Sequence, residues 1–353
     1  MNFDKFVDIV KNSISMYLPK EYENAEIKIK KIKKLNNSYL GMTVLKEGAD
    51  LSPTINLNAM YKHYTEKPCR IATVMKEISG LIQEGTKEGF NVSSLFDYEK
   101  AKDRLYIRLT SAEGNADVLA DVPYVKKEDL AITAHIAINS SGEGLTSTTV
   151  DNSMLKMYGI TQEQLFQDAI ANSEILFPVQ IISMHDLMMD IYLDMLQDFE
   201  NMGMTQNEIA QMLSDIERVD DGYPMTVVSN ARRFNGAGAI FYPGVMEQLE
   251  KEMKGDYFVL PSSVHEVIIV PDNGLYDSKE LAKMVNEVNS KEVPTRDQLS
   301  GNVYHYDAKN KVFELAEKFE ARKKNEKLNA PKQEQTSQKT KAEEKKNHKG
   351  LRL

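Results

Sequence analysis

The chain has 353 residues, of which 41% are hydrophobic and 27% are charged, so it can bury a sizeable core as one large domain or as two subdomains. Its single cysteine, Cys69, excludes an intramolecular disulfide and any cysteine-based zinc or iron–sulfur site within one chain, which favours a reducing compartment. No apolar run approaches the ~20 residues of a membrane-spanning helix and the N-terminus lacks the apolar stretch of a signal peptide, so we expect a soluble, cytoplasmic protein without membrane association.

Charge is divided unevenly along the chain, although the net value is only −9. Residues 322–353 contain 11 Lys or Arg and 4 Glu, a net charge of +7, whereas residues 1–321 contain 33 basic and 49 acidic residues, a net charge of −16. Such an acidic body repels a phosphate backbone. The tail is attracted to nucleic acid, to an acidic partner or to the body itself.

The N-terminal third begins with a helix over residues 3–18, since apolar residues recur at helical spacing and Pro19 follows. Alternating segments Glu26–Leu35 and Ser38–Leu45 flank Asn36-Asn37 and predict a β-hairpin with one lysine-rich, solvated face. Leu51–Leu57 contains Ser52-Pro53, which predicts an extended edge leading into further helices.

The middle of the chain combines strands and helices. Period-two alternation predicts strands over Asp103–Ser111 and Asp129–Asn139, and the turn at Ser140–Gly144 predicts that the second forms a hairpin with Leu145–Val150. Thr161 begins a capping-box sequence and a helix. Residues from about His185 to Arg218 are Met-rich and helical in spacing, with a break at Gly203.

The C-terminal part contains several short strands. We expect strands at Met225–Ser229, Tyr257–Leu260, Val264–Val270 and Val303–Tyr306, and helices near Pro243, after a capping Ser278 and from Lys311. Low apolar content predicts disorder past about Asn325.

These elements predict an α+β fold of short antiparallel strands and hairpins with amphipathic helices. The expected parts are an N-terminal helix, hairpin and helices over 1–125, an α+β part over 126–321, and a disordered basic tail over 322–353. Whether the first two parts form one domain is left open.

Several segments together resemble an uncharacterised bacterial family that carries only a domain-of-unknown-function label. The resemblance rests above all on the string from Tyr257 to Val267, which contains Leu-Pro-Ser-Ser-Val-His-Glu, and also on Leu51–Ile55, Asp129–Ile132, Gly159–Thr161, Met284–Asn289 and Val303–Tyr306. Members of this family resemble chromosomal and mobile-element proteins of anaerobic Gram-positive bacteria. The resemblance implies no activity, substrate or catalytic residue.

His265-Glu266 is the first candidate for catalysis. It lacks the second histidine of a helical His-Glu-x-x-His zinc site, since Ile269 stands four residues on and the surroundings favour a strand. Ser262 or Ser263 could act as a nucleophile with His265 as base, but no glycine-flanked elbow is present. The alternative is that the serines shape a turn and that His265 and Glu266 are structural.

For small ligands, the best candidates are Arg232 and Arg233 with the glycine cluster at Gly236 and Gly238, because glycines let backbone amides approach an anion. The spacing matches neither the dinucleotide nor the Walker pattern.

We predict no metal and no cofactor. His185, Asp186 and Asp190 share a helix, and Met184, Met188, Met189, Met195 and Met202 form either core or an adaptable partner-binding face.

Two hypotheses of function follow. The first is a cytoplasmic, non-enzymatic binding or adaptor protein that contacts a protein partner through its acidic body or basic tail. The tail lacks aromatic residues, so its contact with nucleic acid would be weak and non-specific. The second is a hydrolase-like enzyme of unrecognised type around Ser262, Ser263, His265 and Glu266, with Arg232, Arg233 or His305 as additional members.

Overall fold

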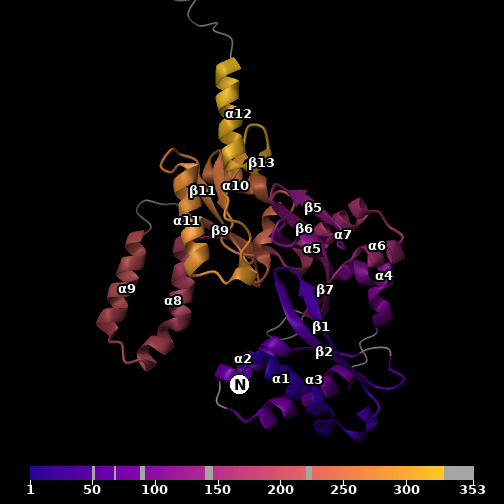
Figure 1. The fold of residues 1–353 in the computed structure, drawn as a ribbon. Coiled ribbons are helices and arrows are strands. Elements are labelled where there is room, and N and C mark those ends of the chain that lie inside the picture. The colour runs from indigo at the N-terminus through magenta and orange to yellow at the C-terminus, as the bar shows by residue number, and fades with distance from the viewer. Residues whose placement is uncertain (50–51, 67–68, 88–91, 140–145, 220–224, 330–353) are drawn as a thin grey trace, which may run out of the picture.

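The computed structural model describes residues 1–49, 52–66, 69–87, 92–139, 146–219 and 225–329. Figure 1 shows an N-terminal group of elements at the bottom, two further sheets above it, and α12 projecting at the top. The helices are α1 (Phe3–Ser13), α2 (Leu57–Glu66), α3 (Ile71–Lys87), α4 (Tyr98–Ala101), α5 (Ala116–Leu119), α6 (Asn152–Tyr158), α7 (Gln162–Leu176), α8 (Met184–Asn201), α9 (Gln206–Val219), α10 (Val245–Met253), α11 (Ser278–Lys291) and α12 (Ala316–Asn329).

The strands belong to three antiparallel sheets, which confirms the α+β class. They are β1 (Glu26–Lys34), β2 (Asn37–Leu45), β3 (Thr54–Asn56), β4 (Leu105–Ser111), β5 (Tyr124–Lys127), β6 (Leu130–Asn139), β7 (Thr146–Thr149), β8 (Val179–Ser183), β9 (Thr226–Asn230), β10 (Tyr257–Leu260), β11 (Val267–Pro271), β12 (Tyr304–Asp307) and β13 (Val312–Leu315). Among the described segments, no helix is long and apolar enough to cross a membrane.

The first sheet, in the order β1-β2-β3, has its own core. β1 and β2 pair from Glu26↔Leu45 to Lys34↔Asn37, and Asn36 in the turn has a left-handed φ of 58°, as a tight hairpin requires. The predicted hairpin is therefore confirmed. Helices α1, α2 and α3 cover the sheet, and the buried side chains of this core all lie between residues 6 and 82.

The second sheet has the order β4-β6-β5. Strand β7 pairs with residues 135–139 of β6, beyond the residues that pair with β5. Leu105, Ile107 and Leu109 of β4 are buried, as the alternation predicts. Helix α7 packs on this sheet, and its Ser173 hydroxyl oxygen accepts the Ile107 N–H at 2.8 Å. β4 lies before the expected boundary at 125/126 and β5 crosses it, yet both strands belong to the same sheet as β6.

The third sheet has the order β13-β12-β10-β11-β9-β8. Alternation divides its side chains between two clusters. Tyr257 and Tyr304 lie in the large core shared with the second sheet. Phe258 and Leu260 face the opposite way and pack with Leu281 of α11 in a smaller cluster.

Three predictions at the C-terminal side need correction. Asp277, not Ser278, is the N-cap of α11 and forms a capping box with Glu280. The last helix does not begin at Lys311, because Val312–Leu315 form strand β13. The helix begins at Ala316. Helix α12 ends at Asn329, beyond residue 322 where the tail is expected to begin, and residues 330–353 lie outside the described part of the chain.

Candidate functional site

A small cavity of about 100 Å³ lies where segments distant in the sequence converge. Its lining residues come from the β1–β2 turn, from β4, from the loop after β9, from the β10–β11 turn and from the segment before β12, and they are Leu35, Asn36, Arg108, Leu109, Thr110, Phe234, Asn235, Val264, His265, Arg296 and Asp297. The volume exceeds the ~10–15 Å³ that a single water needs. We call this cavity the Arg108 pocket.

Arg108 is the main charge of the pocket. Ile107 and Leu109 on either side of it face the core, so the side chain of Arg108 leaves the opposite face of β4. Its Nη2 donates to Oδ1 of Asn235. Within the described ranges no carboxylate lies at ion-pair distance, and burial lowers the pKa of the Arg108 guanidinium, because removal from water disfavours the charged form.

Asn235 supplies an amide nitrogen that has no acceptor in the described part of the chain. The residue is only 6% exposed and its φ is 52°, the left-handed conformation that asparagine tolerates better than most residues. Its Oδ1 is used by Arg108, whereas its Nδ2 is buried and finds no hydrogen-bond acceptor in the described part of the chain. A buried amide without a partner is costly, so a ligand acceptor at this point would stabilise the pocket.

His265 is a hydrogen-bond donor in this arrangement. Its Nδ1 accepts the backbone N–H of Asn235 at 3.1 Å, so the neutral imidazole carries its proton on Nε2. Nε2 lies 3.8 Å from Oδ1 of Asp297, and Phe234 packs beside the ring with centroids 5.3 Å apart. With one nitrogen occupied and the other protonated, the ring has no lone pair available for general-base work.

The pocket therefore gathers donors. Arg108, Asn235 Nδ2 and His265 Nε2–H are available for an acceptor, while Asp297 at the rim is paired with Arg296 at 3.4 Å. Such a set fits a carboxylate or a phosphate group, since a guanidinium and amide donors form charge-assisted hydrogen bonds to oxyanions.

A larger cleft of about 630 Å³ adjoins the pocket at Asn36 and at the 295–298 segment. One wall carries the lysines of β1, Lys31, Lys33 and Lys34, and the other carries amides and hydroxyls of Asn286, Asn289, Gln298 and Ser300. Lys31 and Lys33 are on the same face of β1 as Ile27 and Ile29, which pack against the first core. The two lysines lie beyond the end of that core. The cleft can thus receive the polar remainder of a ligand.

The predicted serines lie next to His265 in the sequence but do not contact its imidazole. The Ser263 hydroxyl donates to Glu266 Oε1 at 3.1 Å and accepts the His265 backbone N–H at 3.0 Å. The Ser262 backbone N–H donates to Leu260 O, which is typical of a turn. No hydrogen bond joins either serine to the ring among the residues that the structure describes.

The predicted arginines and glycines flank Phe234 and Asn235 in the sequence, but they do not line the Arg108 pocket and do not form an anion loop. Arg233 pairs with Asp190 of α8 at 3.0 Å and with Gln180, and Arg232 lies over the ring of Phe177. The amides of Gly236 and Ala237 donate to the carbonyls of His265 and Val264, so they are not available to an anion. Gly236 instead permits close packing against β9, whereas a Cβ at Gly238 would make only ordinary contacts with β4.

The remaining predicted groups lie on α8. Asp190 is engaged by Arg233, and Asp186 accepts the Ser183 hydroxyl at 2.7 Å, so these two carboxylates do not share a site. Of the Met-rich stripe, Met184, Met188 and Met189 are partly buried, whereas Met195 and Met202 are exposed.

Sequence reasoning missed Arg108, Asn235 and Asp297. No local pattern pointed to Arg108, because a charged residue between Ile107 and Leu109 is what the polar face of an alternating strand carries. Asn235 immediately precedes Gly236 of the predicted glycine cluster. No local pattern pointed to Asp297, because it reaches His265 only through the tertiary fold.

Comparison with known proteins gives one match. A protein-family model matches residues 3–308, and the family is described as one of unknown function. No curated protein and no solved structure gives a significant match. The matched region ends directly after β12, so β13 and α12 lie beyond it.

Proposed function

The chain belongs to DUF5688, a family of unknown function, and we propose that it is a binding protein for a ligand with a carboxylate or phosphate group. The observation that carries this proposal is the desolvated Arg108, which has no carboxylate partner in the described chain and lies beside the unpartnered amide of Asn235. Arg108 donates to Asn235 Oδ1 but has no anionic partner among the described residues, and a ligand anion would supply the countercharge that a desolvated cation normally has.

Charge supports a specific site over a diffuse one. Residues 1–321 carry a net charge of −16, so the body as a whole repels anions. The donors of the Arg108 pocket lie beside Lys31 and Lys34 of the adjoining cleft, whereas Lys33 is paired with Asp117 and Glu113 also lines the cleft. The ligand's charged group lies in the pocket and its polar remainder in the cleft.

The hydrolase-like alternative has less support. It needs His265 as base for Ser262 or Ser263, but Ser263 is directed to Glu266 and the His265 ring is bonded through Nδ1 to Asn235. A binding role uses the same imidazole as a donor, with no change of its hydrogen bonds.

The proposal includes the cytoplasmic setting and a macromolecular partner. The lone cysteine favours a reducing compartment, and the opposite charges of body and tail favour a partner drawn by electrostatics. Ligand binding at the pocket and partner binding by the tail are separable and can be tested apart.

Isothermal titration calorimetry of the full chain with inorganic phosphate and with citrate tests the pocket. We expect one of the two anions to bind, and the one that binds identifies the group. Arg108→Lys keeps the charge but loses the planar fork, so binding should weaken about tenfold or more. Arg70→Gln removes an exposed arginine elsewhere and should bind like the unaltered chain.

Circular dichroism establishes that both variants are folded. The proposal fails if neither anion binds the unaltered chain, or if Arg108→Lys and the unaltered chain bind equally well.

A further inference from the structure

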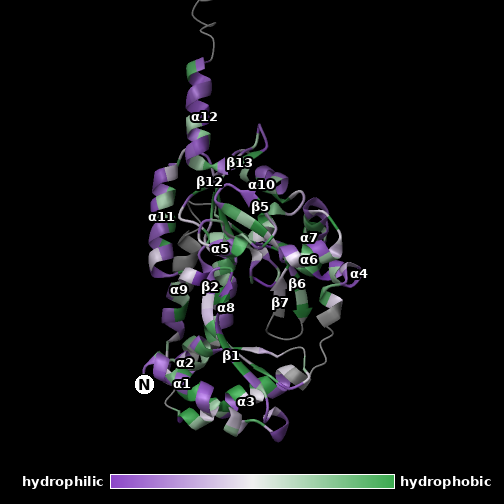
Figure 2. Cartoon of the chain, turned by 45° about the vertical axis from the view of Figure 1, so that its right-hand side comes forward, coloured by the Kyte–Doolittle hydropathy of each residue, from purple (hydrophilic) through white to green (hydrophobic). Residues whose placement is uncertain are grey.

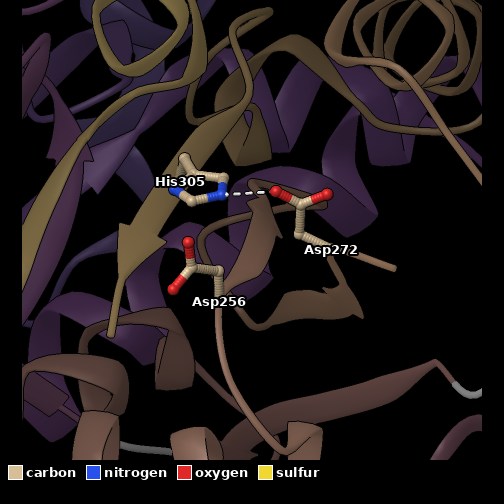
Figure 3. Close-up of side chains that lie close together, drawn as sticks. All are labelled: Asp256, Asp272 and His305. Atoms are coloured by element: carbon tan, nitrogen blue, oxygen red, sulfur yellow. Dashed lines mark hydrogen bonds and ion pairs between the residues drawn. The ribbon is translucent and has the colours of Figure 1, made fainter. Parts of the chain in front are cut away.

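A second polar cluster lies at the opposite end of the β10–β11 hairpin from His265. Asp256 immediately precedes β10, Asp272 immediately follows β11, and His305 is on β12, which pairs with β10 on its other side. The Asp272 N–H donates to the Asp256 carbonyl at 3.0 Å, which holds the two aspartates together. Figure 3 shows the two carboxylates directed toward the imidazole.

His305 is fully buried and held rigidly. Its ring stacks on Phe319 of α12, with centroids 3.5 Å apart, and meets Phe258 edge to face. Nε2 lies 3.0 Å from Oδ2 of Asp272, whereas the buried Nδ1 has no hydrogen-bond partner in the described part of the chain. Nε2 is therefore the ring nitrogen that faces Asp272 and through which His305 can bind a metal.

The charges of the cluster are not balanced by protein groups. One ligand atom from each of the three residues lies within 4.8 Å of the others. Asp256 Oδ1 accepts the Ala308 N–H at 2.9 Å, but neither Asp256 nor Asp272 has a Lys or Arg at ion-pair distance in the described ranges. Two carboxylates this close repel each other unless a cation lies between them.

We infer that Asp256, Asp272 and His305 bind a divalent transition-metal ion. One imidazole and two carboxylates form a mixed N,O set, which suits Zn²⁺ or Mn²⁺ better than the all-oxygen cages of Ca²⁺ or Mg²⁺. The 3.0 Å between Nε2 and Oδ2 is a hydrogen-bond length, and two ligands that each lie ~2.1 Å from a tetrahedral ion are ~3.4 Å apart, so a small shift of the partly exposed Asp272 would admit the metal. Three protein ligands leave coordination positions open to water or to a further ligand.

Isosteric variants test the site without disturbing the hydrogen bonds. In Asp272→Asn an amide oxygen can still accept from His305, and in Asp256→Asn it can still accept from Ala308, so both should fold. Titration calorimetry of the full chain with Zn²⁺ should give one site per chain, weakened about tenfold or more in each variant. Asp8→Asn, which removes an exposed carboxylate on α1, is the matched control and should bind Zn²⁺ unchanged.

Mg²⁺ in the same titration should bind far more weakly than Zn²⁺. The inference is overturned if both aspartate variants, shown to be folded by circular dichroism, bind Zn²⁺ as tightly as the unaltered chain, or if the unaltered chain binds no Zn²⁺. Because the cluster and the Arg108 pocket lie at opposite ends of one hairpin, the anion titration and the metal titration report on them separately.

Discussion

Gly236 is the residue where the backbone around the Arg108 pocket is packed most closely. A Cβ at this position would lie 2.3 Å from Ser229 Oγ and 2.5 Å from the backbone N of Asn230. Backbone atoms cannot move aside cheaply, so Gly236→Ala should lower the free energy of unfolding by about 1–3 kcal/mol. Urea unfolding followed by circular dichroism measures the change.

Gly80, in the interior of α3, is the matched control. A Cβ there meets nothing within 4 Å, and alanine is the better helix former, so Gly80→Ala should raise the free energy of unfolding by about 0.5–1 kcal/mol. Equal effects of the two substitutions would contradict the packing role of Gly236.

At the residue scale, sequence reasoning could find polar residues but not their partners. His265 was singled out because it stands in a distinctive string, and it does line a pocket. Its neighbours there, Arg108 and Asp297, lie 157 positions before it and 32 positions after it in the sequence. A single sequence carries no signal for such contacts, because they depend on which sheet edges and turns meet.

At the scale of elements, ion pairs attach helix α12 to the rest of the fold, and their contribution to stability depends on pH. The buried carboxylate of Asp307 accepts from Arg322 at 2.8 Å and from Lys323 at 3.2 Å. Burial alone would raise the pKa of Asp307, but hydrogen bonds from Arg322, Asn310 and Lys323 outweigh it and hold the pKa below its usual range. Figure 2 shows α12 to be mostly hydrophilic, so these contacts, with Phe319, hold it in place.

Asp307→Asn should therefore lower the free energy of unfolding by about 1–3 kcal/mol at neutral pH, since Lys323 loses its carboxylate while Arg322 keeps Glu314 and Glu326. A depressed pKa stabilises the fold above the ordinary value of about 3.9 and loses this contribution as the pH falls toward the folded value. The deficit of the variant should thus shrink between about pH 5 and pH 3. Urea midpoints across this range measure it.

Asp8→Asn serves as control here also and should show no deficit at any of these pH values. A deficit of Asp307→Asn that is independent of pH would mean that packing, and not charge, docks α12.

Long, strongly patterned elements could be predicted, whereas short ones that depend on a neighbouring strand could not. The hairpin of β1 and β2 and helices α8 and α9 follow from local pattern. The four residues of β13 come directly before a segment with helical spacing, so local pattern assigns them to the helix. They form a strand because they pair with β12. β5 and β8 are likewise short and were not predicted.

At the scale of the whole molecule, the apolar clusters divide the chain earlier than the expected boundary at 125/126. The first core takes its buried residues from 6–82, and the large core begins at Leu95. The β1–β2 turn bridges the two, since Thr110 donates to Asn36 at 2.9 Å and Lys33 pairs with Asp117 at 2.5 Å. The cleft beside this bridge therefore lies between two separately packed parts of the chain, as many ligand sites do.

The division of charge is also a property of the whole molecule. Because α12 ends at Asn329, the boundary between the acidic body and the basic tail moves from residue 322 to residue 330. Residues 330–353 contain seven Lys or Arg and three Glu, a net charge of +4, so residues 1–329 keep a net charge of −13. A labelled DNA duplex should bind the full chain weakly at about 50 mM salt and lose binding by about 200 mM, because such contacts release counterions. A chain that ends at Asn329 should not bind it, since the acidic body repels phosphate.

Replacement of the seven tail Lys and Arg by Gln keeps the length and removes the charge, so this variant should also fail to bind DNA. Both altered chains should unfold within about 0.5 kcal/mol of the full chain, since the buried residues of the described cores all precede residue 330. Fluorescence anisotropy measures the binding and urea unfolding the stability. Equal DNA binding by the shortened chain would instead place the contact on the body, where the lysines of β1 would be the residues to replace next.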